Sequence, residues 1–229
     1  MYKINNFSKK GYANDKFNKD AIYINDYDDE ILICSLADGL NSKKFSKEGA
    51  EICQAALSEY VIKHPKDYFL NKELFIKECV ITIKEAIYKK SVQKKINVDE
   101  FSSTLIFLIF FKKKNIVVWL HLGDGIVAIE DKGDNVKILS YPHNGTSLNN
   151  TYSTNTRNLL EYMFYGECKL NDIKKVIMFT DGAMLPLYEK NKFTKKGEKL
   201  IVLGIETVQT YLESVFPNDD YSGVEICME

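Results

Sequence analysis

The sequence predicts an α+β fold in which antiparallel sheets are covered by helices. Two strand-like segments near the N-terminus are followed by two long stretches with helical periodicity, and strand-like segments then return. No regular alternation of strand and helix occurs, which argues against a parallel βαβ sheet. With 229 residues, of which 45% are hydrophobic, the chain can bury a substantial core, and we expect one domain spanning residues 1–229.

The first elements predict a β-hairpin followed by a helix. Residues 20–26 and 30–37 are apolar or β-branched and are separated by a short polar stretch, as in a hairpin. Residues 46–62 place apolar side chains on one helical face, with Ser46 as the expected N-cap. Pro65 is expected to end this helix.

A second amphipathic helix is expected over about residues 71–91, and the hydrophobic period then changes from helical to strand-like. The next four segments are rich in β-branched and aromatic residues and predict an antiparallel meander: residues 103–111, 115–122, 125–131 and 136–141. The C-terminal part predicts a short helix, a strand, a helix and a last strand: residues 157–164, 174–180, 206–216 and 222–228.

Composition and charge exclude several classes of protein. The net charge is −1 and no dense Lys/Arg stripe is interleaved with aromatic residues, so we expect no nucleic-acid partner. The longest hydrophobic run, residues 105–111, is too short to span a bilayer, so we expect no membrane partner either. The five cysteines form no C-x-x-C pair, which favours a reduced, cytoplasmic setting.

Three Asp-Gly pairs follow apolar runs, at 38–39, 124–125 and 181–182. The pair at 124–125 precedes a returning strand, so on its own it predicts a hairpin turn. No returning strand follows the other two pairs, and a hairpin does not explain them. Carboxylates at the ends of buried strands suit hard cations, which take oxygen ligands. Asp219 and Asp220 bring further carboxylates to the start of the last strand.

The order of these motifs resembles that of the metal-dependent type 2C protein serine/threonine phosphatases, and in particular their compact bacterial branch. The resemblance covers nearly the whole chain. It rests on six short motifs in the family's order: NKDA at 18–21, ADG at 37–39, SSTL at 102–105, LGDG at 122–125, TDG at 180–182 and DDYS at 219–222.

The resemblance implies a four-layer α-β-β-α sandwich and a centre of two Mg²⁺ or Mn²⁺ ions, with a weaker third ion. It implies the following site: Asp38 bridging both ions, the Gly39 carbonyl on one of them, Asp181 and Asp219 completing the ligand set, Asp20 holding water at the ions, and Asp124 serving the third ion. Asp38 and Asp181 are the residues expected to be essential for catalysis. Asp219 is preferred to Asp220 because the family's ligand is the first residue of this pair.

The activity implied by the resemblance is hydrolysis of phosphoserine and phosphothreonine in proteins by a metal-activated water. A phosphorylated protein and an opposing serine/threonine kinase are the expected partners. The family's phosphate-binding arginine falls here on Asp15, with Lys16 beside it. Lys16 is therefore the expected substrate-binding cation and Arg157 is the alternative. A catalytically weak binding or regulatory module with the same fold remains the alternative function.

Overall fold

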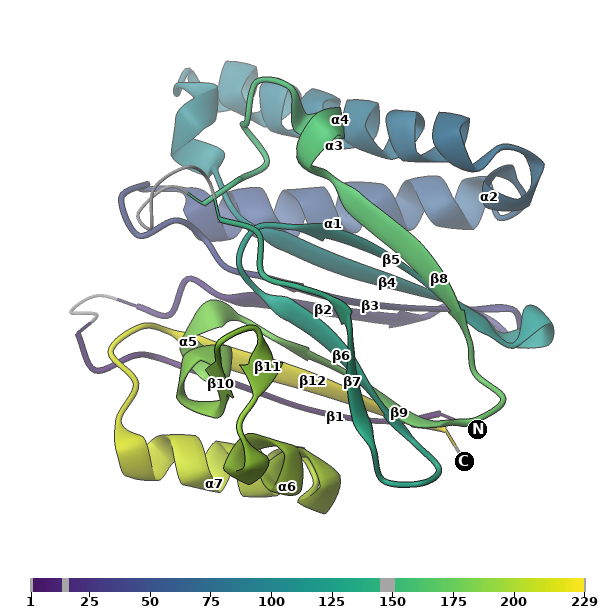
Figure 1. Cartoon of the computed structure of the whole chain (residues 1–229). Helices are drawn as coiled ribbons and strands as arrows, with labels where there is room; N and C mark the ends of the chain where they lie inside the picture. Colours follow the sequence, from purple (N-terminus) through teal and green to yellow (C-terminus); the bar gives the residue numbers. More distant parts are fainter. Residues whose placement is uncertain (1, 14–16, 145–150, 229) are drawn as a thin grey trace.

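The computed structural model describes residues 2–13, 17–144 and 151–228, and Figure 1 shows their arrangement in four layers. Two five-stranded antiparallel sheets lie face to face, and helices cover the outer face of each. The expected α-β-β-α sandwich is therefore confirmed.

The first sheet, called sheet I, has the strand order β2-β3-β4-β5-β8. Its strands are β2 (Ala21–Asp26), β3 (Ile31–Ala37), β4 (Leu105–Phe111), β5 (Ile116–Leu122) and β8 (Phe164–Lys169). Two long helices, α1 (Ser46–Lys63) and α3 (Lys72–Lys94), cover its outer face, and the short helices α2 (Asp67–Leu70) and α4 (Leu159–Tyr162) lie near them.

The second sheet, called sheet II, has the strand order β1-β12-β9-β6-β7. Its strands are β1 (Tyr2–Lys9), β12 (Tyr221–Met228), β9 (Ile173–Phe179), β6 (Ile126–Asp131) and β7 (Val136–Ser140). Helices α6 (Lys195–Leu203) and α7 (Ile205–Val215) cover it. The short helix α5 (Asp181–Met184) and the hairpin of β10 (Tyr188–Glu189) and β11 (Lys192–Phe193) connect β9 to α6.

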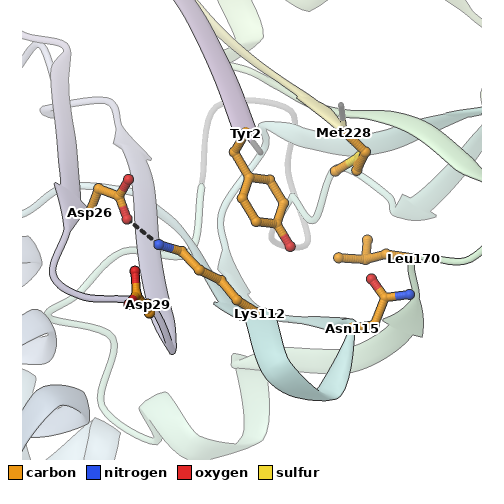
Figure 2. Close-up of a pocket in the computed structure, with 7 residues that line it drawn as sticks. All are labelled: Tyr2, Asp26, Asp29, Lys112, Asn115, Leu170 and Met228. Atoms are coloured by element: carbon orange, nitrogen blue, oxygen red, sulfur yellow. Dashed lines mark hydrogen bonds and ion pairs between the residues drawn. The ribbon is translucent and has the colours of Figure 1, made fainter.

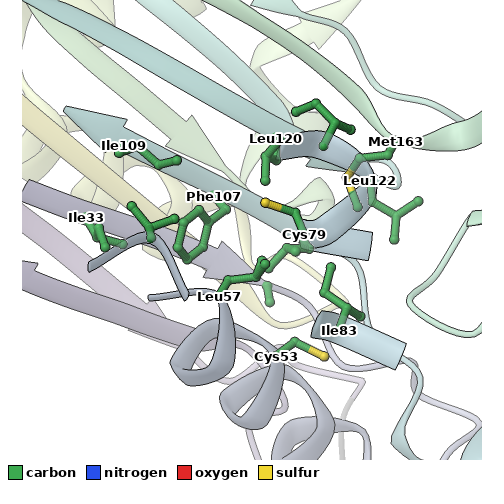
Figure 3. Close-up of a cluster of buried hydrophobic side chains, with 14 of the residues drawn as sticks. Ile33, Cys53, Leu57, Cys79, Ile83, Phe107, Ile109, Leu120, Leu122 and Met163 are labelled. Carbon is green, nitrogen blue, oxygen red and sulfur yellow. The ribbon is translucent and has the colours of Figure 1, made fainter. Parts of the chain in front are cut away.

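The central strands are apolar on both faces because each face is buried. In β4, residues 105, 107, 109 and 111 pack toward α1 and α3, whereas residues 106, 108 and 110 pack toward sheet II. Figure 3 shows the first of these layers, where Phe107 and Leu120 of the sheet meet Leu57 of α1 and Cys79 of α3. A strand buried on both sides loses the alternation of polar and apolar residues, which explains the continuous run LIFLIFF.

Most of the elements expected from the sequence are present, but the meander is wrong. After β5 the chain leaves sheet I, and β6 and β7 belong to sheet II. The partner of β5 on its other side is β8, which the sequence pattern did not reveal. Ser46 is not the N-cap of α1: Phe45 holds that position, and the buried Ser46 hydroxyl donates to the Lys43 carbonyl oxygen at 3.3 Å.

Other elements that were not expected are β1, the short helices α2 and α5, the helix α6, and the hairpin of β10 and β11. In β1 the sequence YKINNFSK has little apolar patterning, and most of its side chains are at least partly exposed because the strand lies at a sheet edge. Among the described residues, no helix combines the length and the apolar character that a membrane crossing requires.

Phe107→Ala tests the packing between sheet I and its helices. Phe107 is fully buried, so the truncation should lower the free energy of unfolding by about 3–5 kcal/mol. Urea denaturation followed by circular dichroism measures this loss. Tyr88→Ala, at a side chain on α3 that is 65% exposed, should change the free energy of unfolding by no more than about 0.5 kcal/mol. Equal losses in the two variants would contradict the assigned core.

Candidate metal centre

The pairing of the strands gathers the predicted aspartates at one end of the sandwich. Ala21 pairs with Ala37, so Asp20 and Asp38 lie on adjacent strands of sheet I, immediately next to this pair. In sheet II, Phe179 pairs with Gly223 on one side and with Ile126 on the other. Asp181, Asp219 and Asp124 lie a few residues beyond these three positions. Figure 1 shows α5, which begins at Asp181, at the end of the sandwich away from both termini.

The SSTL motif holds the backbone of Asp38. The Asp38 N–H donates to the Thr104 hydroxyl at 2.9 Å, and the Thr104 N–H donates to the Asp38 carbonyl oxygen at 2.8 Å. Gly39 forms a bridge with Ser103 and packs against the start of α1, where a Cβ would lie 2.8 Å from the Ser46 hydroxyl. Glycine follows Asp38 because nothing larger fits between the loop and the helix.

Close backbone contact also explains the second Asp-Gly pair. At Gly182 an added Cβ would lie 2.1 Å from the carbonyl oxygen of Asp220, so only glycine lets α5 approach the 219–220 loop. The Gly182 N–H donates to the Asp181 carboxylate at 2.7 Å. The same contact brings Asp181 close to the last pair of aspartates.

Asp219 and Asp220 are neighbours with different environments. Asp220 is 2% exposed, and its two carboxylate oxygens accept the backbone N–H groups of Gly11 at 2.9 Å and Lys19 at 2.7 Å. Asp219 is partly exposed and accepts from the Asn41 amide at 2.9 Å. Asp220 therefore joins three chain segments, whereas the Asp219 carboxylate faces the loop that follows Gly39.

Asp20 carries a buried oxygen without a hydrogen-bond partner among the described residues. Its Oδ2 accepts from the Thr180 hydroxyl at 3.1 Å, and its backbone N–H donates to the Asn18 side chain at 2.8 Å. Its Oδ1 is buried and unpaired. An unsatisfied buried carboxylate oxygen costs free energy, and such an atom points to a water or cation that would satisfy it.

Asp124 does not lie in a hairpin, contrary to the expectation for the isolated Asp-Gly pair. The strand before it, β5, belongs to sheet I, and the strand after it, β6, belongs to sheet II. The segment around Asp124 therefore crosses from one sheet to the other, and the Thr151 hydroxyl donates to the Asp124 carboxylate.

Burial and mutual repulsion raise the pKa of several of these carboxyl groups. Burial raises the pKa of Asp20 to about 7, with Asp220 adding to the rise. Burial followed by repulsion from Asp124 and Asp219 raises the pKa of Asp181 to about 8. The pKa of Asp38 is raised well above its ordinary value by burial and then by the charges of the four carboxylates at positions 20, 181, 219 and 124. Burial, with a contribution from Asp219, also raises the pKa of Asp124.

The chemistry of this donor set fits a hard divalent cation, which would offset the repulsion and take only oxygen ligands. As the side chains stand, no three of the described His, Cys, Asp and Glu residues form a group that could hold a metal ion. The aspartates are close enough to influence one another's ionisation, but they would have to rotate inward to share an ion.

Three basic side chains, those of Lys16, Arg157 and Lys19, are candidate partners of the substrate or of the loops at this end. Lys16 lies outside the described residues. Arg157 is exposed and immediately precedes the segment leading into α4, on the helical layer outside sheet I. Lys19 was not expected to have a role, yet its buried ammonium donates to the carbonyl oxygens of Leu40, Asn41 and Lys43 at 3.4, 2.7 and 2.8 Å. The position of this lysine in the NKDA motif could have indicated its role, because a lysine next to a buried strand needs hydrogen-bond partners.

A cavity of about 590 Å³ lies at the other end of the sandwich and is separate from the aspartates. Figure 2 shows Tyr2, Asp26, Lys112 and Met228 around it. These residues lie at or next to the strand ends that are away from the aspartates of the candidate centre. The Lys112 ammonium pairs with Asp26, so the main positive charge of the cavity is already neutralised. We therefore assign the functional site to the aspartate end.

Comparison with solved structures shows the same fold. The serine/threonine phosphatase Stp1 from Staphylococcus aureus is 14% identical, with a TM-score of 0.71 over 100% of this chain and 96% of that chain. The catalytic domain of the serine threonine protein phosphatase PstP, solved with two manganese ions, is 13% identical, with a TM-score of 0.69 over 99% of this chain and 97% of that chain. RsbX, solved with magnesium, is 15% identical, with a TM-score of 0.62 over 100% and 96%.

The sequence itself was compared with curated proteins and with family models. No curated protein matches it. The model of the protein phosphatase 2C family matches residues 9–213, which include five of the six motifs. Because this match covers most of the chain and the fold agrees, the protein belongs to the protein phosphatase 2C family.

Proposed function

We propose that the protein is a metal-dependent phosphoprotein phosphatase that hydrolyses phosphoserine and phosphothreonine at a dinuclear Mg²⁺ or Mn²⁺ centre. The observation that carries the proposal is the set of aspartates at one end of the sandwich, whose raised pKa values show that the site favours neutralisation of their charge. The structural relatives PstP and RsbX, solved with manganese and magnesium, support the choice of ion.

The residues that would hold the two ions are Asp38, the Gly39 carbonyl, Asp181 and Asp219, and Asp124 would hold a weaker third ion. When bound, two such ions supply a water that ionises near neutral pH and hold the substrate phosphate in line with it. The third-ion role of Asp124 agrees with its place between the sheets and with its Thr151 hydrogen bond, which leaves the other carboxylate oxygen for a cation.

The residues around the ligands hold them in place. Thr104 fixes the backbone of Asp38 on both sides, so its carboxylate projects from the end of a rigid strand. Asn41 and the Asp220 N–H both donate to one oxygen of Asp219 at 2.9 Å, which leaves the second oxygen available. Asp20, held by Thr180, keeps one buried oxygen without a partner among the described residues, and this oxygen would hold a water at the ions.

The proposed substrate is a phosphorylated protein, and an opposing serine/threonine kinase is the proposed partner. The structural relatives Stp1 and PstP are serine/threonine phosphatases, which supports this substrate class. Lys16 is the proposed cation for the substrate phosphate, because it lies beside the position of the family's arginine.

Phosphate release should depend on Mn²⁺ or Mg²⁺ and stop when a chelator is added. Asp38→Asn and Asp181→Asn should each lower kcat for an aryl phosphate by at least about 100-fold, because each removes a charged metal ligand. Steady-state phosphate release with saturating metal measures this loss. Asp172→Asn, at an exposed aspartate near the opposite end, is the control and should keep wild-type turnover.

Absence of metal-stimulated release from the wild type would support a binding or regulatory module instead. Wild-type turnover in Asp38→Asn would show that the assigned centre is wrong.

Without metal, the protein should become less stable as the pH rises from about 4 to about 8. The folded state holds protons on Asp20 and Asp181 up to about pH 7 and 8, whereas the unfolded chain releases them near 3.8, so the free energy of unfolding falls across this range. Melting curves in chelator at pH 5 and pH 8 measure the effect. Each kcal/mol lost corresponds to roughly 2–4 °C.

Asp181→Asn removes one of the repelling carboxylates and isolates their contribution from that of other titrating groups. In chelator the variant should melt higher than the wild type at pH 8, and the difference should shrink at pH 5. Mn²⁺ should raise the melting temperature of the wild type more at pH 8 than at pH 5. A metal-free wild type as stable as the variant at pH 8 would contradict the carboxylate repulsion.

Lys16→Ala should raise KM for a phosphopeptide several-fold and leave kcat nearly unchanged. A lysine is a point charge without the planar fork of arginine, and loss of one charge-assisted hydrogen bond costs on the order of 1 kcal/mol of binding. Steady-state kinetics on a phosphothreonine peptide measures KM and kcat, with Arg157→Ala as the matched variant. An effect of Arg157→Ala alone would transfer the phosphate contact to that residue.

A further inference from the structure

The loop that follows Gly39 forms one wall of a pocket of about 460 Å³ next to the aspartates. We call it the lysine pocket, and it is lined in part by Phe17, Lys19, Lys43, Lys44, Phe45 and Glu100. Asn41 also lines it and donates its amide to the Asp219 carboxylate at 2.9 Å. Asn41 therefore links the wall of the lysine pocket to one of the proposed metal ligands.

The wall of the lysine pocket is held in a fixed conformation. The Lys19 ammonium joins three carbonyl oxygens of the 40–43 segment, and the Lys19 N–H is itself held by the buried Asp220. The Phe45 N–H donates to the Glu100 carbonyl oxygen at 3.0 Å, which anchors the other end of the loop. A pocket built on such bonds is largely formed before a ligand binds, which reduces the entropy cost of binding.

The charge of the lysine pocket is positive and available to a ligand. Lys43 and Lys44 form no salt bridge with any of the described carboxylates, and the Lys44 ammonium lies 5.4 Å from the centre of the Phe45 ring. Glu100 is the acidic residue of the pocket wall, and one of its oxygens accepts the Lys44 N–H at 2.9 Å. Lys43 and Lys44 against Glu100 leave a net positive charge at the pocket wall.

The aromatic walls favour a peptide over a free anion. Phe17, which is 48% exposed, and Phe45 both line the pocket. These rings can contact the methylene groups of a side chain or a stretch of peptide backbone, which a small inorganic anion lacks. A lysine ammonium group attracts a negative charge as a point charge and does not require the bidentate geometry of one particular oxyanion.

We propose that the lysine pocket binds an acidic side chain, Asp or Glu, that flanks the phosphorylated residue of a protein substrate. The inference rests on the proposed phosphatase function and adds a sequence preference to it. Partly exposed charge pairs are weak, so the expected preference for an acidic flank is about three- to tenfold in KM, and it should decrease with added salt.

The test compares two phosphothreonine peptides that differ only in Glu or Gln at the positions flanking the phosphothreonine. The readout is the ratio of their KM values with Mn²⁺ for the full chain. The wild type should favour the Glu peptide about three- to tenfold, and Lys43→Ala/Lys44→Ala should bring the ratio close to one. Lys43→Arg/Lys44→Arg should keep the preference. Lys199→Ala, at an exposed lysine on α6, should leave the ratio unchanged.

A wild-type ratio of one, or an equal loss for both peptides in the double alanine variant, would overturn the inference. Inhibition of aryl phosphate hydrolysis by inorganic sulfate that disappears in the double variant, without any peptide preference, would show a free-anion site and would also overturn it.

Two further measurements separate this inference from the proposed function. Aryl phosphate turnover by the wild type tests the phosphatase function without any flanking residue. Fluorescence anisotropy with the two labelled peptides tests the lysine pocket without turnover. Tighter binding of the Glu peptide by a protein that releases no phosphate would support the pocket and reject the function, whereas turnover with equal binding would do the reverse.

Discussion

Repulsion among carboxylates at one end of the sandwich is the interaction on which the candidate site depends. Burial, and then the charges of four other aspartates, raise the pKa of Asp38. Such a cluster destabilises the metal-free fold near neutral pH, and a bound divalent cation would reverse that penalty. The same energy that disfavours the ionised cluster would therefore favour metal binding. The metal-free fold is therefore less stable than it would be without the cluster, but it has a site that can bind a cation.

The two sheets supply the rigidity that keeps the aspartates together against this repulsion. Central strands such as β4 are buried on both faces, so the strand ends that carry the aspartates are fixed by packing on two sides. Close backbone contacts at Gly39 and Gly182 then hold the loop after β3 against α1 and the start of α5 against the 219–220 segment. Each of these aspartates lies within two residues of the end of a strand.

A second set of contacts connects the segments around the aspartates. Asp220 joins Gly11 and Lys19 to the start of β12, and Lys19 in turn fixes the loop after Gly39. Asn41 on that loop returns to Asp219. These hydrogen bonds join segments of both sheets. The same network therefore supports the proposed metal ligands and the wall of the lysine pocket.

The sequence alone predicted the central elements, the fold class and the family. The hairpin of β2 and β3, the helices α1 and α3, and the last strand β12 follow from hydrophobic periodicity, because their apolar patterns are strong and local. The aspartates stood out because Asp-Gly pairs without a returning strand are unusual. The family assignment also came from the order of the motifs, and the family match confirms it.

Tertiary structure decided what local pattern does not encode. The chain crosses from sheet I to sheet II at Asp124, and this crossing replaced the expected meander, because a strand's periodicity is the same whichever neighbour it pairs with. Edge strand β1 was missed since one exposed face gives a weak apolar signal. The different surroundings of Asp219 and Asp220 arise from segments 178 to 209 residues away in sequence, and they exist only once the sheets have packed.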